Sequence, residues 1–252
     1  YNKWKKLLKF DFEDIEHDKN YIARYFSLLY LFGHPHHITG NNDKWVISDE
    51  GLFPVFRNEG NIVRLSEIGF DFNNSLFNNM YYSKTIDKYK EMLIDKNIFN
   101  SRNMYLQNIV KKEKFIMSSF DSIFESNEDT HRRFNDNYFY VKNFHTQLKK
   151  VLSDNIAFIK KYLNSGFIMV MKKNDSLHIV STRNNKLEIF LEKATYEMYP
   201  KTYFLDESVI KSIKNEIKIK VKNNISDLKF IDKVTNDTIY NESSKIHFIT
   251  VD

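Results

Sequence analysis

Three histidines stand close together in a part of the chain that is rich in glycine and proline. His34, His36 and His37 directly follow Gly33, and five of the six glycines lie between residues 33 and 69. Imidazole nitrogens bind divalent metal ions and also accept protons as general bases. Glycine and proline are typical of shaped loops, where catalytic groups often lie. We therefore predict a loop here that is a candidate site for metal binding or acid–base chemistry.

The order of residues in this loop resembles the opening of the HNH endonuclease signature. The chain has a His pair, an isoleucine and a Gly-Asn turn at residues 36–41. The resemblance implies that His36 helps to hold a divalent metal and that His37 is the general base that activates water. It also implies a further site residue about twenty positions on, for which Asn58 and Asn61 are candidates. On this interpretation the protein is a metal-dependent nuclease.

Two other interpretations of the same loop stay open. His34 and His36, taken with the downstream Tyr81 and Tyr82, resemble the HUH nickases. That resemblance implies His34 and His36 as metal ligands and a tyrosine that attacks DNA. However, Pro35 between the two histidines disfavours the strand on which such a pair would lie. In the third interpretation the loop is structural, and its imidazoles cap the preceding helix or bond to the backbone without a metal.

A pair of arginines in the middle of the chain is a candidate for binding nucleic acid. Arg132 and Arg133 are followed by several aromatic residues between positions 134 and 140. Guanidinium groups beside flat rings are typical of sites for single-stranded nucleic acid. Alternatively, the two arginines pair with the nearby acids Glu128 and Asp129.

Four C-terminal lysines form a second basic candidate. Lys211, Lys214, Lys218 and Lys222 recur at three- and four-residue spacing, which in a helix gives one lysine stripe along a phosphate backbone. The segment from Ile217 to Lys222 also alternates between apolar and basic residues. That period of two favours a half-exposed strand whose lysines deter edge pairing.

The composition limits the classes of function. The 252-residue chain contains no cysteine, which excludes disulfides, cysteine-ligated zinc, iron–sulfur clusters and a thiol nucleophile. This is compatible with a reducing compartment such as the cytoplasm. The net charge of +5 is a mild surplus that lies in the central and C-terminal parts. The most apolar run, Tyr21 to Phe32, contains Arg24 and is too short to span a membrane. We therefore predict a buried core helix there and no transmembrane segment.

The spacing of apolar residues predicts an α+β fold with long amphipathic helices and small antiparallel sheets. A first helix is expected from Asn20 to Phe32, ending at Gly33. Apolar residues recur at helical spacing from Tyr105 to Ile123 and again from Val141 to Leu163, which predicts two long amphipathic helices. Gly166 is expected to end the second of them.

The strands are expected in two places, a short N-terminal sheet and a C-terminal β-meander. Turn-forming residues separate short apolar runs in both regions. A further helix is expected from Asp206 toward Asn215. The expected strands are Lys44–Ile47, Leu52–Phe56 and Ile62–Ile68 in the first sheet, Phe167–Met171, Leu177–Thr182 and Leu187–Leu191 in the meander, and Thr202–Leu205 and Ile246–Val251 beyond it.

We expect three regions with soft boundaries, which also fit a single domain. Residues 1–100 hold the N-terminal helix, the Gly/His-rich loop and the short strands. Residues 101–165 are helical, and residues 166–252 hold the meander with a basic helix or strand.

These observations favour a nucleic-acid-associated protein. The abundance of Asn, Lys, Ile, Phe and Tyr is typical of an AT-rich genome, such as that of a virus, a mobile element or a low-GC microbe. A metal-dependent nuclease that uses the His34–His37 loop and a divalent metal is the catalytic version of this hypothesis. The alternative is a non-catalytic interaction or assembly subunit of a larger complex, in which aromatic residues form interfaces with protein partners.

Overall fold

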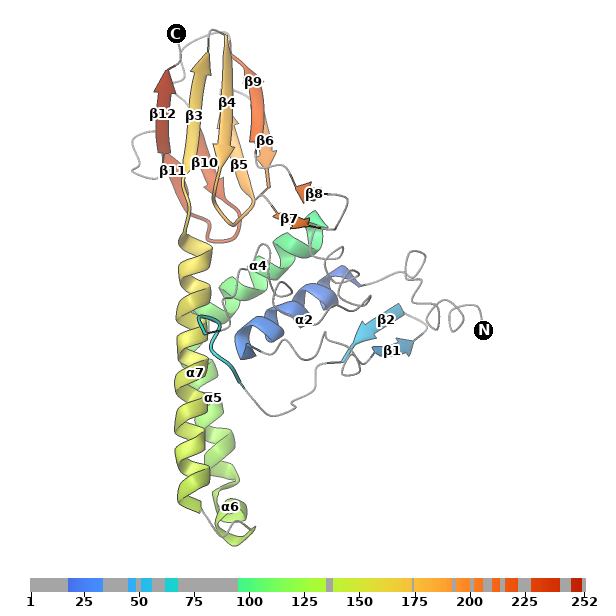
Figure 1. Cartoon of the computed structure of the whole chain (residues 1–252), viewed down its shortest axis with the longest axis vertical. Coiled ribbons are helices and arrows are strands. Elements are labelled where there is room, and N and C mark those ends of the chain that lie inside the picture. The colour runs from blue at the N-terminus through green and yellow to red at the C-terminus, as the bar shows by residue number, and fades with distance from the viewer. Residues whose placement is uncertain are drawn as a thin grey trace.

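One long helix joins a helical part of the protein to a β-sandwich (Figure 1). The computed structural model describes residues 18–33, 45–48, 51–55, 62–67, 95–134, 138–173, 175–191, 194–199, 202–205, 210–213, 216–221, 228–240 and 246–250. The helices are α2 (Lys19–Phe32), α4 (Lys96–Lys111), α5 (Glu113–Ser126), α6 (Glu128–Phe134) and α7 (Tyr138–Asn164). None of the helices in these ranges is long and apolar enough to cross a membrane.

The strands confirm the expected α+β fold. They are β1 (Trp45–Ser48), β2 (Gly51–Pro54), β3 (Ile168–Lys173), β4 (Ser176–Ser181), β5 (Leu187–Leu191), β6 (Ala194–Met198), β7 (Thr202–Leu205), β8 (Ile210–Ile213), β9 (Glu216–Lys220), β10 (Lys229–Asp232), β11 (Thr238–Tyr240) and β12 (Ile246–Thr250).

Helix α2 begins and ends where the sequence predicts. The Asp18 side chain caps its first turn by accepting hydrogen bonds from the backbone N–H groups of Asn20 and Tyr21 at 2.9 and 3.1 Å. Gly33 ends the helix in the left-handed conformation with φ of 58°. A β-carbon at Gly33 would lie 1.9 Å from the carbonyl oxygen of Val63, so this close approach requires glycine.

The first of the two predicted long helices is interrupted. The chain forms α4 up to Lys111, changes direction at Lys112, and continues as α5 from Glu113. Helices α5 and α6 then run beside the N-terminal half of α7, away from the sandwich (Figure 1). We call α5, α6 and this half of α7 the helical arm. The second predicted helix is confirmed as α7, which has 27 residues and a length of about 40 Å.

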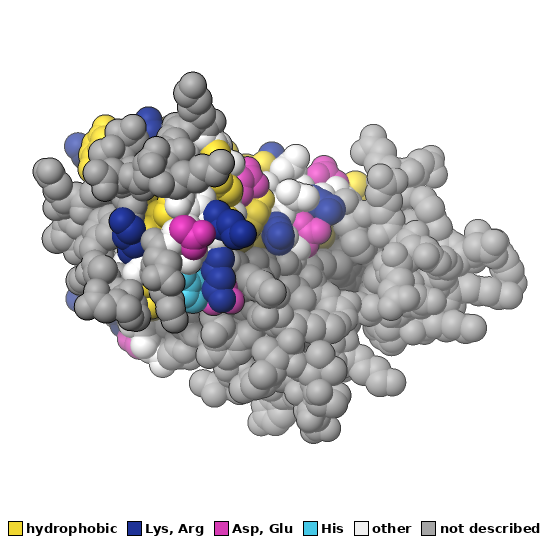
Figure 2. Space-filling model, turned by 90° about the horizontal axis from the view of Figure 1, so that it is seen from above, with side chains coloured by type: hydrophobic (Ala, Val, Ile, Leu, Met, Phe, Trp, Pro, Cys, Tyr) yellow, Lys and Arg dark blue, Asp and Glu magenta, His cyan; other side chains and the backbone are white. Residues whose placement is uncertain are grey.

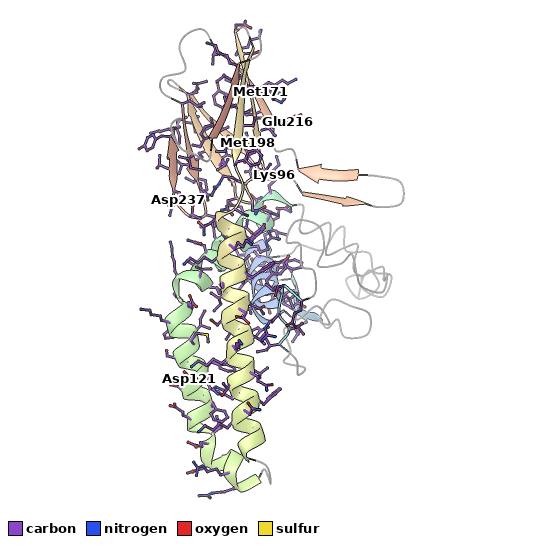
Figure 3. The ribbon with its side chains drawn as sticks, turned by 60° about the vertical axis from the view of Figure 1, so that its left-hand side comes forward. Lys96, Asp121, Met171, Met198, Glu216 and Asp237 are labelled. Carbon is purple, nitrogen blue, oxygen red and sulfur yellow. The ribbon has the colours of Figure 1, made fainter. Side chains whose placement is uncertain are left out.

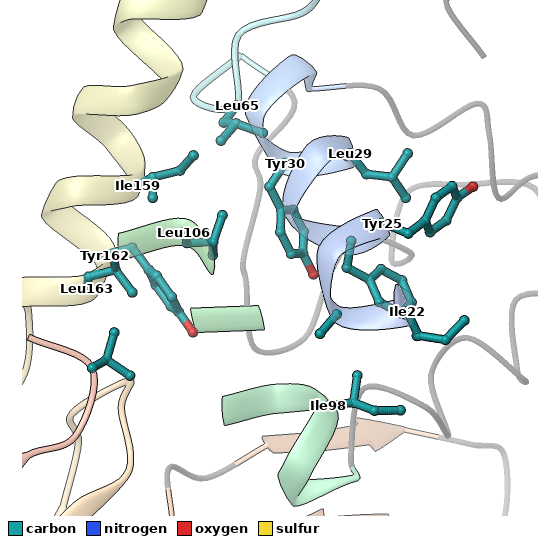
Figure 4. Close-up of a cluster of buried hydrophobic side chains, with 13 residues drawn as sticks. Ile22, Tyr25, Leu29, Tyr30, Leu65, Ile98, Leu106, Ile159, Tyr162 and Leu163 are labelled. Carbon is teal, nitrogen blue, oxygen red and sulfur yellow. The ribbon is translucent and has the colours of Figure 1, made fainter. Parts of the chain in front are cut away.

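The helical core lies where α2 packs against α4 and α7 (Figure 4). Helix α2 carries apolar residues on nearly every side. It is covered on most of its sides, which agrees with the buried core helix that the sequence predicts. Ile22, Phe26 and Leu29 of α2 are buried together with Leu106 of α4 and Ile159 of α7. Burying each of these side chains stabilises the fold by about 1.5–3 kcal/mol.

The C-terminal strands form two four-stranded sheets that face each other. The strand orders are β12-β3-β4-β9 and β11-β10-β5-β6, and only the β12–β3 pair is parallel among the pairs described. Buried residues alternate along β4 and β5, so each sheet turns one apolar face toward the other. The expected C-terminal strands are present and meander-like, with one correction: β3 and β4 form a hairpin, but β5 does not pair with β4 and lies in the other sheet between β10 and β6.

Two of the predicted elements are wrong. Residues 62–67 are an extended segment followed by a turn, with no strand pairing, because the backbone of Val63 and Leu65 bonds to helical residues instead. Residues 210–213 form strand β8, which pairs with β7, and not the expected helix. The structure confirms the predicted pairing of β1 with β2. It also confirms the predicted strands β7 and β12.

The cap of α4 leads to a pH-dependent prediction. Asp95 accepts hydrogen bonds from two N–H groups of the first turn and from Lys19 Nζ at 2.7 Å. Burial raises the pKa of the Asp95 carboxyl, but these hydrogen bonds outweigh burial and hold the pKa below its ordinary value. A depressed pKa stabilises the fold above the ordinary carboxyl pKa, and this contribution is lost as the pH falls through the lower folded-state pKa.

We therefore expect Asp95→Asn, which keeps a capping side chain, to weaken the acid dependence of stability. The free energy of unfolding, measured by urea denaturation between about pH 6 and pH 2, should fall less for the variant than for the wild type. Equal losses for the two proteins would contradict the role of the Asp95 charge.

Candidate nucleic-acid interface

The predicted nuclease residues lie outside the described part of the chain. His34, His36, His37 and Asn58 all fall in ranges that the structure does not describe, as do Tyr81 and Tyr82. The metal-dependent interpretations of this loop therefore stay predictions. Within the described ranges, no three His, Cys, Asp or Glu side chains are grouped so that they could hold a metal ion.

The predicted arginine pair lies at the far end of the helical arm. Arg132 and Arg133 are both exposed on α6. Arg132 Nη2 contacts the Glu128 carboxylate at 2.8 Å, one helical turn away. This is one of the ion pairs that the alternative interpretation expects.

The four C-terminal lysines do not form a helical stripe in the described ranges. Lys211 lies in β8 and Lys218 is exposed in β9, while Lys214 and Lys222 lie outside the described residues. Strand β9 alternates between exposed and more buried residues, which confirms the strand interpretation for this segment. Viewed from above the sandwich, dark blue and magenta side chains are interspersed on the described part of the surface (Figure 2).

A different set of lysines, which the sequence analysis did not single out, lies on α7. This helix contains five lysines and a single acidic residue, Asp154. Because successive residues are rotated by about 100°, residues 142, 149 and 160 lie in one line and residues 150 and 161 lie beside it. We call the four exposed members the lysine face of α7: Lys142, Lys150, Lys160 and Lys161.

The single acid of α7 forms an ion pair with a neighbouring segment. Arg64 Nε lies 2.8 Å from the Asp154 carboxylate, and Arg64 Nη1 lies 2.7 Å from Glu67. Hydrogen bonds to Glu67 and Asp154 raise the pKa of the Arg64 guanidinium above its ordinary value. Arg64 is shared by two carboxylates, so the three side chains together carry a net charge of −1, which offsets only part of the four positive charges of the lysine face.

The helical arm is held in place by contacts between α5 and α7. Lys149 Nζ lies 2.5 Å from the Asp121 carboxylate, and Figure 3 shows Asp121 beside α7. The His145 ring stacks on Phe120 and Phe124 with ring centres 4.8 and 4.1 Å apart. These contacts cover one side of α7 and leave the lysine face in solvent.

The upper end of α7 is fixed by a buried polar network at the sandwich. Asp232 forms an ion pair with Arg183 at 2.8 Å, and both side chains are 0% exposed. The other carboxylate oxygen of Asp232 accepts hydrogen bonds from the N–H groups of Val234 and Thr235, each at 3.0 Å. Asn185 links this pair to the end of α7, since its amide donates to Asp232 and to the Leu163 carbonyl.

The same network continues into α4 through a buried arginine. The Arg102 guanidinium donates to Asn103 Oδ1 at 2.9 Å and to the hydroxyls of Tyr30 and Tyr162 at 3.2 and 3.1 Å. Asn103 in turn donates to Asn185 Oδ1 at 3.2 Å. The helical part and the sandwich are therefore joined by fully buried polar contacts that set the direction of α7.

No protein-family model matches this chain, and no curated protein sequence matches it significantly. The proposals below therefore depend on the geometry and charge of the described residues.

Proposed function

We propose that the protein is a nucleic-acid-associated protein that binds a phosphate backbone along the lysine face of α7. One observation carries the proposal: the four exposed lysines follow one side of a rigid helix whose single acid is paired with Arg64. Binding of this kind depends on charge and is independent of base sequence.

The dimensions of the face suit an extended polyanion. Lys142 and Lys161 are separated by 19 residues, which corresponds to about 28 Å along the helix axis. Phosphates of one DNA strand recur every 3.4 Å or so along the duplex, so several of them lie within this span. Lysine side chains are long and flexible, and they reach phosphates without a preformed pocket.

We expect Lys→Gln substitution at all four positions of the lysine face to weaken duplex DNA binding by on the order of a hundredfold at about 0.15 M salt. The matched control carries Lys→Gln at four lysines of the sandwich, Lys172, Lys218, Lys220 and Lys229, and so loses the same net charge. Fluorescence anisotropy with a labelled duplex measures both affinities. Equal losses for the two variants, or a loss for the control alone, would contradict the proposal.

A second function is favoured by the exposed side of α5 in the helical arm. Helix α5 has no buried residue, and it exposes 68% of Phe115 and 65% of Ile123. Large apolar side chains exposed on a projecting helix are typical of interaction surfaces. We therefore keep an interaction or assembly subunit as the alternative, in which the arm docks a protein partner.

A further inference from the structure

The lysine face of α7 consists of two rows that follow neighbouring lines along the helix. Lys142 and Lys160 form the 142/160 row, because they are eighteen residues, or five full turns, apart. Lys150 and Lys161 form the 150/161 row, since they lie about 80° and 100° around the helix from the first row. Each row carries two positive charges, and about a quarter of a turn separates the two rows.

The separation of the two rows suits a ligand that has two lines of phosphates. At the outer radius of a helix, about 5–6 Å, positions a quarter of a turn apart are about 8 Å from each other. The grooves of duplex DNA are about 6 and 12 Å wide, and each groove has a different strand on either side. Long, flexible lysine side chains adjust to this range of widths. A helix that lies along a groove can therefore place one row on each strand.

The other residues of the lysine face also favour a duplex over a single strand. Thr146, Ser153 and Ala157 lie between the rows, and their short side chains leave both rows able to reach one ligand. Proteins that hold single strands usually stack the bases on exposed aromatic rings. The aromatic residues of α7 from 141 to 164 lie on other sides of the helix, and Tyr162 packs in the helical core. This part of the face thus offers phosphate contacts without a stacking platform.

We infer, on the basis of the function proposed above, that the ligand of the lysine face is double-stranded DNA and that both of its strands are contacted. Helix α7 lies along one groove, with the 142/160 row on phosphates of one strand and the 150/161 row on phosphates of the other. A single strand has only one line of phosphates and would occupy one row. These contacts reach the backbone and not the base edges, so the choice of a duplex is independent of base sequence.

The two-strand contact is tested by neutralising one row at a time. One variant carries Lys→Gln at both lysines of the 142/160 row, and the other carries Lys→Gln at both lysines of the 150/161 row. All four side chains are exposed, so both variants keep the fold, which circular dichroism verifies. The slope of log affinity for a labelled duplex against log salt concentration should become shallower by about 1.8 in each variant. Lys218→Gln with Lys220→Gln, at two exposed positions of β9, is the charge-matched control and should leave the slope unchanged.

The outcomes separate this inference from the proposed function. A shallower slope in one row variant alone would overturn the two-strand contact and leave the proposed function standing, because one line of phosphates would still be bound. Unchanged slopes in both variants would overturn the proposed function and this inference with it.

The choice of ligand is tested with one labelled strand, used alone and paired with its complement. The duplex should bind at least about tenfold more tightly than the single strand at about 0.15 M salt. A single strand that binds as tightly as the duplex would overturn the assignment of a double-stranded ligand, while the proposed function would remain.

Discussion

Replacing Asp232 with alanine is expected to lower the free energy of unfolding by about 3–5 kcal/mol. The carboxylate is the only acidic partner that the described residues offer to the buried guanidinium of Arg183. Removal of Asp232 leaves this positive charge in a site from which water is excluded. It also removes the acceptor for the N–H groups of Val234 and Thr235 and for the Asn185 amide.

Urea denaturation followed by circular dichroism measures this loss. The matched control is Asp237→Ala, which removes an exposed carboxylate from the same turn and should change stability by about 0.5 kcal/mol or less. If Asp232→Ala prevents folding, the double variant Arg183→Met with Asp232→Asn removes the uncompensated charge and should recover part of the stability. An Asp232→Ala loss no larger than that of the control would refute the role of the network.

Replacing Asn155 with alanine is expected to cost about 2–4 kcal/mol. The buried side chain of Asn155 on α7 accepts a hydrogen bond from the Leu65 N–H at 2.8 Å. Its amide donates to the carbonyls of Leu31 and Val63 at 3.1 and 2.9 Å. One side chain thus binds residues 62–67 to both α2 and α7, and its removal leaves three backbone groups, two of them of buried residues, without this partner.

Hydrogen exchange at the Leu65 amide is the most specific readout for this variant, because that amide loses its acceptor. We expect faster exchange at Leu65 together with a lower urea midpoint. Asp154→Ala is the matched control at the adjacent position. It removes an exposed ion pair with Arg64 and should cost about 1 kcal/mol or less. Unchanged exchange at Leu65 in the Asn155 variant would contradict the assigned hydrogen bonds.

Local signals made much of the fold predictable. Asp18 and Gly33 mark the ends of α2, and the apolar residues from Val141 to Leu163 mark α7, because caps and helical spacing are encoded by neighbouring residues. The break at Lys112 has no such signal, since no glycine or proline accompanies it and apolar residues continue on both sides. Its cause is tertiary: α4 packs on α2, whereas α5 follows α7.

The buried polar network was not predicted from the sequence, because it too depends on tertiary packing. Arg102, Asn103 and Asp232 are polar residues that are usually exposed, and only the meeting of α4, α7 and the sandwich buries them. The lysine face could have been found, since Lys142 and Lys160 are eighteen residues, or five helical turns, apart, and Lys150 and Lys161 are eleven residues, or about three turns, apart. Clusters of adjacent basic residues, such as Arg132 and Arg133, are more conspicuous in a sequence than residues so far apart.

The salt dependence of DNA binding tests the proposed function most directly. For each phosphate that a lysine neutralises, the slope of log affinity against log salt concentration changes by about 0.9. We predict that the variant with Lys→Gln at Lys142, Lys150, Lys160 and Lys161 has a slope shallower than the wild type by about 3 to 4, with the sandwich control unchanged. Identical slopes for the wild type and the α7 variant would contradict the proposed function, because the lysine face would then contact no phosphate.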